Sequence, residues 1–366
     1  MVISIFEKKW KLPIPYYVDN GVSNILVDTA LSIIENKTCI KFLKYYRMVG
    51  DLKGLRYYYG NDCSSPIGQP TVKIWQSISI GEDCDSIGII QHETMHSLGI
   101  YHEHARYDRD KYLFMVRKNI DPIYYRDVKK VSKKHSKTFG VPFDYGSVLI
   151  YDIKAYSKNE QETMIPRDKN FIKTMGTQEK ITFNNIKLIN MLYCQNICRN
   201  KIRCMNGGYQ DPNNCNSCRC VKGFTGRWCH FLPPSSMECG KSVVMVKNTI
   251  TLFVQQGRKN CIYHFFSDKR RKLGLYIIRG SFFPNKRSSC YKNNSVEIKY
   301  WNDKTSTGAL FCLADNNILI LTQNNHAMIY YRSIKETNYI KILLKSVVQN
   351  YNTHILRNEF LNENLT

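Results

Sequence analysis

The stretch that decides the fold reads His92-Glu93-Thr94-Met95-His96-Ser97-Leu98-Gly99-Ile100-Tyr101-His102. Residues four apart lie on one face of a helix, so His92 and His96 can direct two imidazoles at one ion. Gly99 allows a sharp bend, which lets His102 return as a third ligand. Three histidines leave one position open for water, as a catalytic zinc site requires, so the pattern predicts one zinc ion per subunit.

The carboxylate inside this stretch predicts the chemistry. Glu93 follows the first histidine and points away from direct ligation, so it can hold a water at the metal and accept its proton. A five-residue HExxH pattern alone is weak evidence, because such short strings arise by chance. The eleven-residue pattern also includes the glycine and the third histidine, which makes a chance string on a core helix a poor explanation.

Bulk composition places the chain among extracellular multidomain proteins. Its 366 residues suit two or three domains, and its fourteen cysteines indicate disulfides and an oxidising compartment. The apolar run between Met1 and Trp10 is too short for a signal peptide, so we expect a secreted protein whose start is truncated. No apolar run reaches the ~18 residues of a membrane span. Glycosylation sequons begin at Asn36, Asn293 and Asn364.

The net charge of +23 is distributed unevenly. Residues 1–194 hold 28 Lys and Arg against 21 Asp and Glu, which gives +7, whereas residues 195–366 hold 25 against 9, which gives +16. One interpretation is attraction to acidic extracellular matrix or glycans. The other is a scattered charge that only keeps the protein soluble. We expect polypeptide substrates, no nucleic acid partner and no membrane span.

Cysteine spacing divides the chain into zones. Residues 10–194 hold four cysteines, residues 195–230 hold six, and residues 239–347 hold four that are widely spaced. A linker is expected at 233–236 and a loose polar tail at 348–366. Periodicity predicts helices at 28–36 and 87–98, and strands at 71–80, 249–254, 274–278 and 317–321.

The histidine stretch and its continuation, HETMHSLGIYHEHARYDRD over 92–110, resemble the signature of the astacin metallopeptidases. Residues 12–16 and 37–42 resemble two further segments of that family. The resemblance covers 10–194 and implies an α+β metzincin domain whose cleft separates two subdomains and binds an extended peptide. It implies His92, His96 and His102 as zinc ligands and Glu93 as the base.

The resemblance also assigns roles outside the histidine stretch. Glu103 falls on a family glutamate that is buried near the mature N-terminus; the alternative is a surface acid. Tyr151 falls on a tyrosine that ligates zinc at rest and then hydrogen-bonds the developing oxyanion. Leu149 stands where the family has a methionine beneath the metal, a substitution of similar volume. Pro66 stands where the family usually has another residue.

The activity that the resemblance implies is a secreted zinc endopeptidase, in which Glu93 assists attack of zinc-bound water on the peptide bond. Substrate backbone is expected to pair with an exposed edge strand ending near 77–80. One alternative is a secreted zinc-binding protein of weak or no catalytic activity that acts through its other modules. Another is a basic adhesive or matrix protein that uses its C-terminal modules.

The cysteine pairings follow from resemblance, because four cysteines alone permit three pairings. The peptidase resemblance implies Cys39–Cys194 and Cys63–Cys84. Residues 198–229 resemble an EGF-like module without the acidic entry of calcium-binding versions; a zinc ribbon is the alternative. Residues 239–347 resemble an all-β CUB-like sandwich, and this domain order is familiar among nematode astacins. These modules imply Cys198–Cys215, Cys204–Cys218, Cys220–Cys229, Cys239–Cys261 and Cys290–Cys312.

Overall fold

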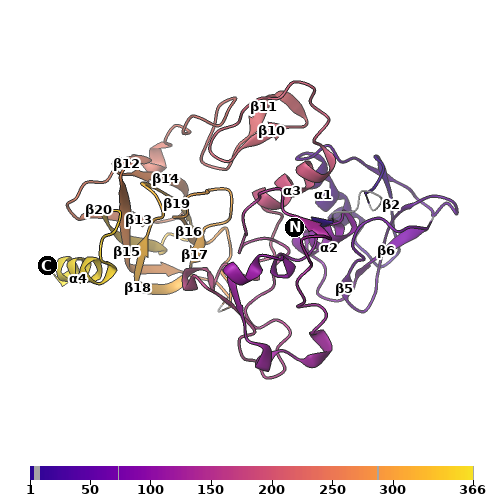
Figure 1. Cartoon of the computed structure of the whole chain (residues 1–366), viewed down its shortest axis with the longest axis horizontal. Coiled ribbons are helices and arrows are strands. Elements are labelled where there is room, and N and C mark those ends of the chain that lie inside the picture. The colour runs from indigo at the N-terminus through magenta and orange to yellow at the C-terminus, as the bar shows by residue number, and fades with distance from the viewer. Residues whose placement is uncertain (4–8, 73, 287, 366) are drawn as a thin grey trace.

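The computed structural model of the chain describes residues 1–3, 9–72, 74–286 and 288–365. It has three parts, which Figure 1 colours from indigo to yellow. We call them the N-terminal unit (1–194), the disulfide-rich segment (195–232) and the C-terminal sandwich (239–348). Among the described residues, no helix has the length and apolar character needed to cross a membrane.

The first half of the N-terminal unit is a sheet of five strands covered by two helices. The strand order is β3-β2-β4-β6-β5, with β5 antiparallel to β6 and the other neighbours parallel. The strands are β2 (Ile14–Val18), β3 (Phe42–Lys44), β4 (Gly54–Tyr58), β5 (Cys63–Ser64) and β6 (Trp75–Ile80). Alternate residues of β2 are buried, as expected for a strand with one face on the core.

Two capped helices pack against this sheet. Helix α1 (Asn24–Glu35) begins four residues earlier than predicted, because the Ser23 side chain accepts a hydrogen bond from the Leu26 N–H and caps it. Helix α2 (Ile87–Ser97) matches the prediction to within one residue, and Ser86 caps it in the same way. Helix α2 carries the first two histidines.

The second half of the unit has little regular structure. Strand β7 (Leu113–Met115) pairs with β9 (Met164–Pro166), and β1 (Val2–Ile3) pairs with β8 (Ser136–Lys137). Short 3-10 helices cover Glu103–Ala105, Arg109–Lys111, Arg117–Asn119, Pro122–Tyr124 and Lys169–Phe171. Helix α3 (Phe183–Tyr193) closes the unit and starts with a capping box between Thr182 and Asn185.

Two expectations about this unit need correction. The expected start at residue 10 leaves out buried residues, because Val2 and Ile3 lie in β1 and the Ile3 N–H donates to the Gly99 carbonyl. The strand predicted at 71–80 begins at Trp75 instead. It is also only partly an edge, because Ser79 and Ile80 are paired with β5 on its outer side.

The disulfide-rich segment is a small hairpin held by cross-links. Its strands are β10 (Tyr209–Asp211) and β11 (Asn214–Arg219). The structure joins all fourteen cysteines, and its pairs are the expected ones: Cys39–Cys194, Cys63–Cys84, Cys198–Cys215, Cys204–Cys218, Cys220–Cys229, Cys239–Cys261 and Cys290–Cys312. Tyr209 anchors the segment to α3, because its hydroxyl accepts from the Asn190 amide.

The C-terminal sandwich consists of two sheets whose inner faces share one core. One sheet has the order β12-β14-β19-β16-β17 and the other β13-β20-β15-β18. The strands are β12 (Val243–Met245), β13 (Thr251–Gln256), β14 (Asn260–Phe266), β15 (Arg271–Phe282), β16 (Ser295–Lys299), β17 (Ala309–Phe311), β18 (Leu313–Leu321), β19 (His326–Arg332) and β20 (Tyr339–Val348). A further 3-10 helix covers Met237–Cys239. The three strands predicted here fall on β13, β15 and β18.

The expected polar tail is instead a helix that packs on the sandwich. Helix α4 (Thr353–Leu365) buries Leu356 and Phe360 completely, and the Phe360 ring stacks on Tyr276 of β15. The prediction of a loose tail failed because these two apolar residues stand four apart among polar ones, a spacing that places them on one helical face. Figure 1 shows α4 at the left end of the molecule.

The sandwich contacts the second half of the N-terminal unit directly. The Lys173 ammonium pairs with Asp315 at 2.7 Å, and the Leu310 N–H donates to the Thr174 hydroxyl at 2.9 Å. The apolar residues of both sides form one continuous buried cluster. The irregular half of the N-terminal unit is therefore packed between the parallel sheet and the sandwich.

Candidate metal centre

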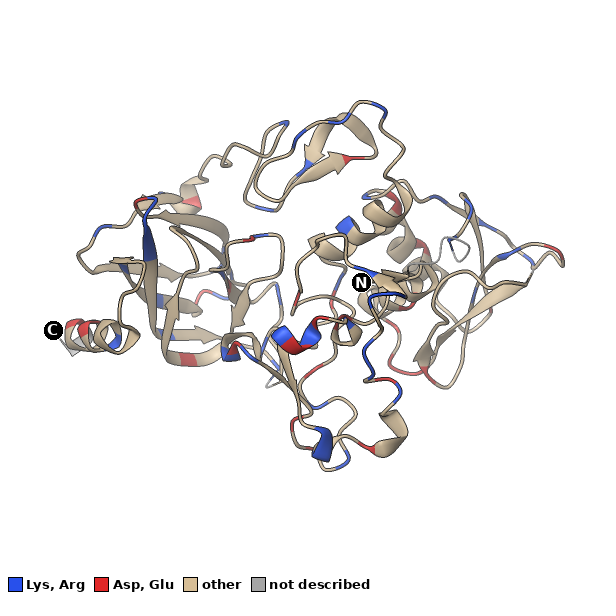
Figure 2. Cartoon of the chain, in the orientation of Figure 1, with Lys and Arg blue, Asp and Glu red and all other residues tan. Residues whose placement is uncertain are grey.

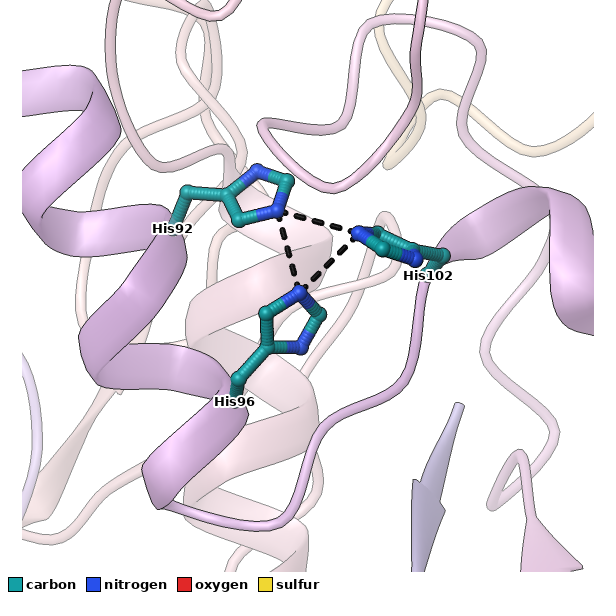
Figure 3. Close-up of side chains that lie close together, drawn as sticks. All are labelled: His92, His96 and His102. Carbon is teal, nitrogen blue, oxygen red and sulfur yellow. Dashed lines mark hydrogen bonds between the residues drawn. The ribbon is translucent and has the colours of Figure 1, made fainter. Parts of the chain in front are cut away.

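Three imidazoles converge at the end of α2. His92 and His96 project from the helix, and His102 reaches them from the segment that follows it, as Figure 3 shows. Their Nε2 atoms form a triangle with sides of 3.0, 3.0 and 3.1 Å. The structure thus brings together the three residues that the sequence predicts as ligands.

Backbone carbonyls determine which nitrogen of two rings carries the proton. His92 Nδ1 donates to the Val148 carbonyl at 2.7 Å, and His96 Nδ1 donates to the Ile100 carbonyl at 2.7 Å. Because a carbonyl only accepts, Nδ1 holds the proton and Nε2 presents a lone pair. Burial lowers the pKa of His92 to about 3 and that of His96 to about 4, so both rings are neutral ligands at physiological pH.

This arrangement fits a zinc ion. Lone pairs of neighbouring imidazoles that face one another at 3.0 Å repel unless a cation lies among them. Tetrahedral zinc with Zn–N bonds of roughly 2.0–2.1 Å needs nitrogens about 3.3 Å apart, close to the sides of the triangle. Three nitrogen ligands favour zinc over calcium or magnesium, which prefer oxygen.

A carboxylate lies beside the triangle without joining it. Glu93 Oε1 is 4.0 Å from His92 Nε2, and Glu93 Oε2 is buried with no hydrogen-bond partner among the described residues. Burial raises the pKa of Glu93 to about 8, and the charge of Asp62 adds to the rise. A cation at the triangle would oppose this and favour the carboxylate. The orphaned oxygen is placed to hold a water.

Tyr151 faces the triangle from the opposite wall. Its ring centroid is 4.8 Å from that of His102 and 5.9 Å from that of His92. Burial raises the pKa of Tyr151 to about 12, so its hydroxyl stays protonated and can donate a hydrogen bond. The Tyr151 and Tyr156 rings lie edge to face, with their centroids 5.3 Å apart.

The turn that carries Tyr151 is held by α3. Asn185 accepts from the Val148 N–H at 3.2 Å and donates to the Ser147 hydroxyl at 2.8 Å. Leu149 stands where the resemblance expects a methionine, and it is fully buried in the core that includes residues of α2. Its carbonyl accepts from the Glu103 N–H at 2.8 Å. The turn therefore offers an apolar floor as well as the carbonyl that orients His92.

Glu103 is buried rather than a surface acid. Its Oε1 accepts from Arg106 Nη1 and from the Asp144 N–H, both at 3.1 Å, and its Oε2 lies 3.8 Å from the amino group of Met1. Arg106 in turn forms two hydrogen bonds with Asp108 at 2.9 Å. These contacts link the segment after the third histidine to the turn below the triangle.

Sequence reasoning missed three residues that shape the site. His104 stacks its ring on His102 at 4.9 Å and bonds the Asp127 carbonyl through Nε2. Asn185 braces the turn, and the Tyr156 ring packs edge to face on its tyrosine. Only Asn185 lies in a recognisable sequence pattern, the Thr-x-x-Asn start of α3. That pattern predicts a helix cap but not the contact of Asn185 with the turn.

A mostly parallel sheet beside a helix that presents the first two histidines of HExxHxxGxxH, with the third on the segment after the helix, is the architecture of the metzincin class of zinc peptidases. The family model described as astacin, a family of peptidases, matches residues 2–194. The chain therefore belongs to the astacin family, as the sequence analysis predicted.

Two relatives of similar sequence support the same placement. Zinc metalloproteinase nas-34 of Caenorhabditis elegans is 34% identical over 340 residues, which are 92% of this chain and 55% of that protein. Zinc metalloproteinase dpy-31 of Haemonchus contortus is 35% identical over 301 residues, 78% of this chain and 54% of that protein. The chain thus spans about half the length of these relatives. Among solved structures, high choriolytic enzyme 1, a hatching enzyme zinc-protease of the medaka Oryzias latipes, is 27% identical with a TM-score of 0.48, covering 53% of this chain and 98% of that one.

Proposed function

We propose that this chain is a zinc-dependent endopeptidase that hydrolyses polypeptides, with His92, His96 and His102 as ligands of one zinc ion. The observation that carries the proposal is the orphaned, buried carboxylate oxygen of Glu93 beside three converging lone pairs. A structural zinc site would have its fourth position closed by a protein ligand. Here a carboxylate that does not ligate faces that position instead.

The chain's own residues divide the work of hydrolysis. Bound zinc supplies Lewis acidity toward a water and the scissile carbonyl. Glu93 orients the water, accepts its proton as the attack proceeds, and then delivers that proton to the leaving amine. Tyr151, protonated because burial raises its pKa to about 12, donates a hydrogen bond to the carbonyl oxygen as negative charge develops there. The carbonyls of Val148 and Ile100 keep two imidazoles in the required tautomer.

The test separates metal binding from catalysis. Zinc content and cleavage of an unfolded protein substrate are measured for the wild type, for Glu93→Ala and for Glu82→Ala, an exposed glutamate that serves as the control. Glu93→Ala should keep its zinc and lose cleavage by several orders of magnitude, whereas Glu82→Ala should match the wild type. Full activity in Glu93→Ala would refute the mechanism.

A second candidate is a zinc-binding protein of weak or no catalytic activity. Leu149 favours it, because this fully buried residue stands at the position where the family resemblance expects a methionine. The same measurement decides between the two. Stoichiometric zinc together with no cleavage by the wild type would favour the second candidate, whereas cleavage that depends on Glu93 favours the first.

We further propose that residues 195–230 are an EGF-like module, that residues 239–347 are a CUB-like domain, and that the protein is secreted. Three disulfides within the disulfide-rich segment and the two-sheet sandwich support these assignments, and the disulfide density supports an oxidising compartment. Asn36 and Asn293 are exposed, as glycan acceptors must be, while the side chain of Asn364 lies outside the described residues. A mass decrease of the secreted protein on enzymatic deglycosylation would test the sequons.

A further inference from the structure

The positive charge of the N-terminal unit is concentrated in one segment. Residues 109–137 hold ten Lys and Arg against three Asp, a net of +7. The whole unit holds 28 against 21, so the remainder has 18 of each and is neutral. We call residues 109–137 the basic segment; all of it is described, and Figure 2 shows its blue residues gathered on loops at the lower centre of the view. An excess so concentrated is not a scattered solubilising charge.

The basic segment lines a half-open cavity of about 570 Å³. Four cations line it, and the apolar side chains of Ile120 and Val128 lie among them; the cations are Arg109, Arg117, Lys129 and Lys130. A hollow that combines an apolar wall with several charges of one sign suits a ligand with opposite charges on a partly apolar body.

The charges of this cavity are only partly neutralised from within. Arg109 is buried, donates to the carbonyls of His104 and Val128, and bonds Asp110 at 3.3 Å. Asp110 also pairs with Lys130. Among the described residues, no carboxylate lies within ion-pair distance of Arg117 or Lys129. Their two charges are therefore available to an anion.

The surface continues from the cavity along a run of lysines. Residues 129–137 read Lys-Lys-Val-Ser-Lys-Lys-His-Ser-Lys, and their five lysines are all exposed. The Lys133 ammonium lies over the Tyr107 ring at 5.7 Å, which leaves its outer side toward solvent. A ligand that neutralises cavity and run together must be extended and must carry anionic groups at regular intervals.

We propose that the cavity and the lysine run form a binding site for a sulfated polysaccharide. An acidic polypeptide is disfavoured, because the two strands of the basic segment, β7 and β8, are only three and two residues long and already pair with β9 and β1. A sulfated glycan needs only side-chain cations, and the half-exposed Tyr125 ring at the cavity offers a flat face for a sugar. This assignment places the binding site for an acidic partner on the N-terminal unit, although the C-terminal part carries the larger net positive charge.

Two successive contacts connect the proposed glycan site to the metal centre. Arg109 Nη1 donates to the His104 carbonyl at 2.9 Å, and the His104 ring stacks on His102. On the other side of the loop, the Tyr124 ring lies 5.0 Å from that of Tyr156, which in turn lies edge to face with Tyr151 at 5.3 Å. A glycan bound here would hold the chain with its cleft close to proteins that carry such glycans.

The experiment measures heparin binding to the full chain in the Glu93→Ala background, so the result does not depend on peptidase activity. The site variant is Arg117→Gln with Lys129→Gln; the matched control is Lys269→Gln with Arg270→Gln, two exposed cations of the sandwich. The site variant should raise the Kd for heparin roughly tenfold or more, and the control should change it less than about twofold. An unchanged Kd for the site variant, or an equal rise for the control, would overturn the assignment.

Two further arms test the chemistry of the ligand. Desulfated heparin and polyglutamate should bind at least tenfold more weakly than heparin at physiological salt. Equal binding of polyglutamate would mean that an acidic polypeptide is the ligand and would refute the proposal. Heparin should also protect Lys129 and Lys133 from acylation, while Lys269 stays reactive; uniform reactivity would refute the site even if heparin binds elsewhere.

Discussion

The histidine triangle is held from two sides that differ in how far their contacts reach along the chain. On one side, α2 and its exit are built locally: Ser86 caps the helix, and His96 Nδ1 donates to the Ile100 carbonyl four residues away. On the other side, the turn over 144–151 depends on residues far away in sequence. Asn185 braces it from α3, and the sandwich contacts it through Thr307.

Asp144 is the centre of the second side. Its Oδ1 accepts from the N–H groups of Gly146 and Thr307, both at 3.0 Å, and its Oδ2 accepts from the Thr182 hydroxyl at 2.9 Å. Lys292 of the sandwich donates to the Gly146 carbonyl at 2.9 Å. The comparison teaches that the helix of His92 and His96 is a local structure, whereas the turn that carries Tyr151 is assembled by the α3 and sandwich contacts.

The largest expected effect comes from removing the Asp144 carboxylate. Asp144→Ala leaves the Gly146 and Thr307 N–H groups without a charged acceptor and the Thr182 hydroxyl with Asn185 alone, and it should lower the free energy of unfolding by about 3–5 kcal/mol. Urea denaturation measures this, and loss of zinc during dialysis should also quicken. Asp19→Ala, which removes a half-exposed ion pair with Arg56, is the control and should cost under about 1 kcal/mol. Equal losses in the two variants would contradict the role of Asp144.

Next in size is the tyrosine that the turn carries. Tyr151→Phe removes one hydrogen-bond donor to the developing oxyanion and should lower kcat about 10²–10³-fold with little change in KM. Tyr156→Phe keeps the ring that lies edge to face with Tyr151, so its kcat should fall several-fold at most. Steady-state kinetics on one peptide measure both. A Tyr151→Phe enzyme with unchanged kcat would remove this residue from the mechanism.

Acid should weaken the sandwich that supports the turn. Glu297 is buried and accepts from the Gly308 N–H beside Thr307; burial alone would raise its pKa, but Lys299 and Arg332 hold its pKa at about 2. The unfolded carboxyl binds protons near pH 4.5, so this stabilisation is complete above that pH and is lost as the pH falls toward 2.

The loss amounts to about 3 kcal/mol from a shift of roughly two units. Stability followed from pH 6 to pH 2 should fall more steeply in the wild type than in Glu297→Gln. Glu336→Gln, an exposed control, should keep the slope of the wild type. Parallel curves for all three proteins would show that Glu297 does not contribute.

The smallest effect concerns the local side. Gly99 has φ +93°, and a Cβ there would lie 2.7 Å from Ile3 Cδ1. Gly99→Ala should therefore destabilise by about 1–3 kcal/mol, through backbone strain and the contact with β1. Gly140→Ala, with φ +72° and open space around the Cβ, isolates the strain. If both variants lose the same free energy of unfolding, the contact with Ile3 does not contribute to stability.

The sequence predictions succeeded for locally built elements and failed where contacts between distant residues decide the structure. Helix α2 was predicted within one residue, because its cap, its period and its glycine exit all lie within a few residues of one another. The prediction of a loose tail was wrong. Leu356 and Phe360 form a stable helix only because they pack on the β13-β20-β15-β18 sheet. The prediction that β6 is an exposed edge strand was only partly right. Strand β5 pairs with the end of β6, and β5 belongs to a loop that lies upstream of β6 in the chain.

By itself, the sequence determined the identity and spacing of the three histidines, the carboxylate proposed as their base and the family, because a helix repeats every 3.6 residues whatever surrounds it. The tertiary structure alone decided what holds Tyr151 and where the charge gathers. Asn185 and Asp144 act across dozens of residues, and the basic segment lines a cavity only after its loop has folded. Contacts between residues distant in sequence arise from packing, which no local pattern records.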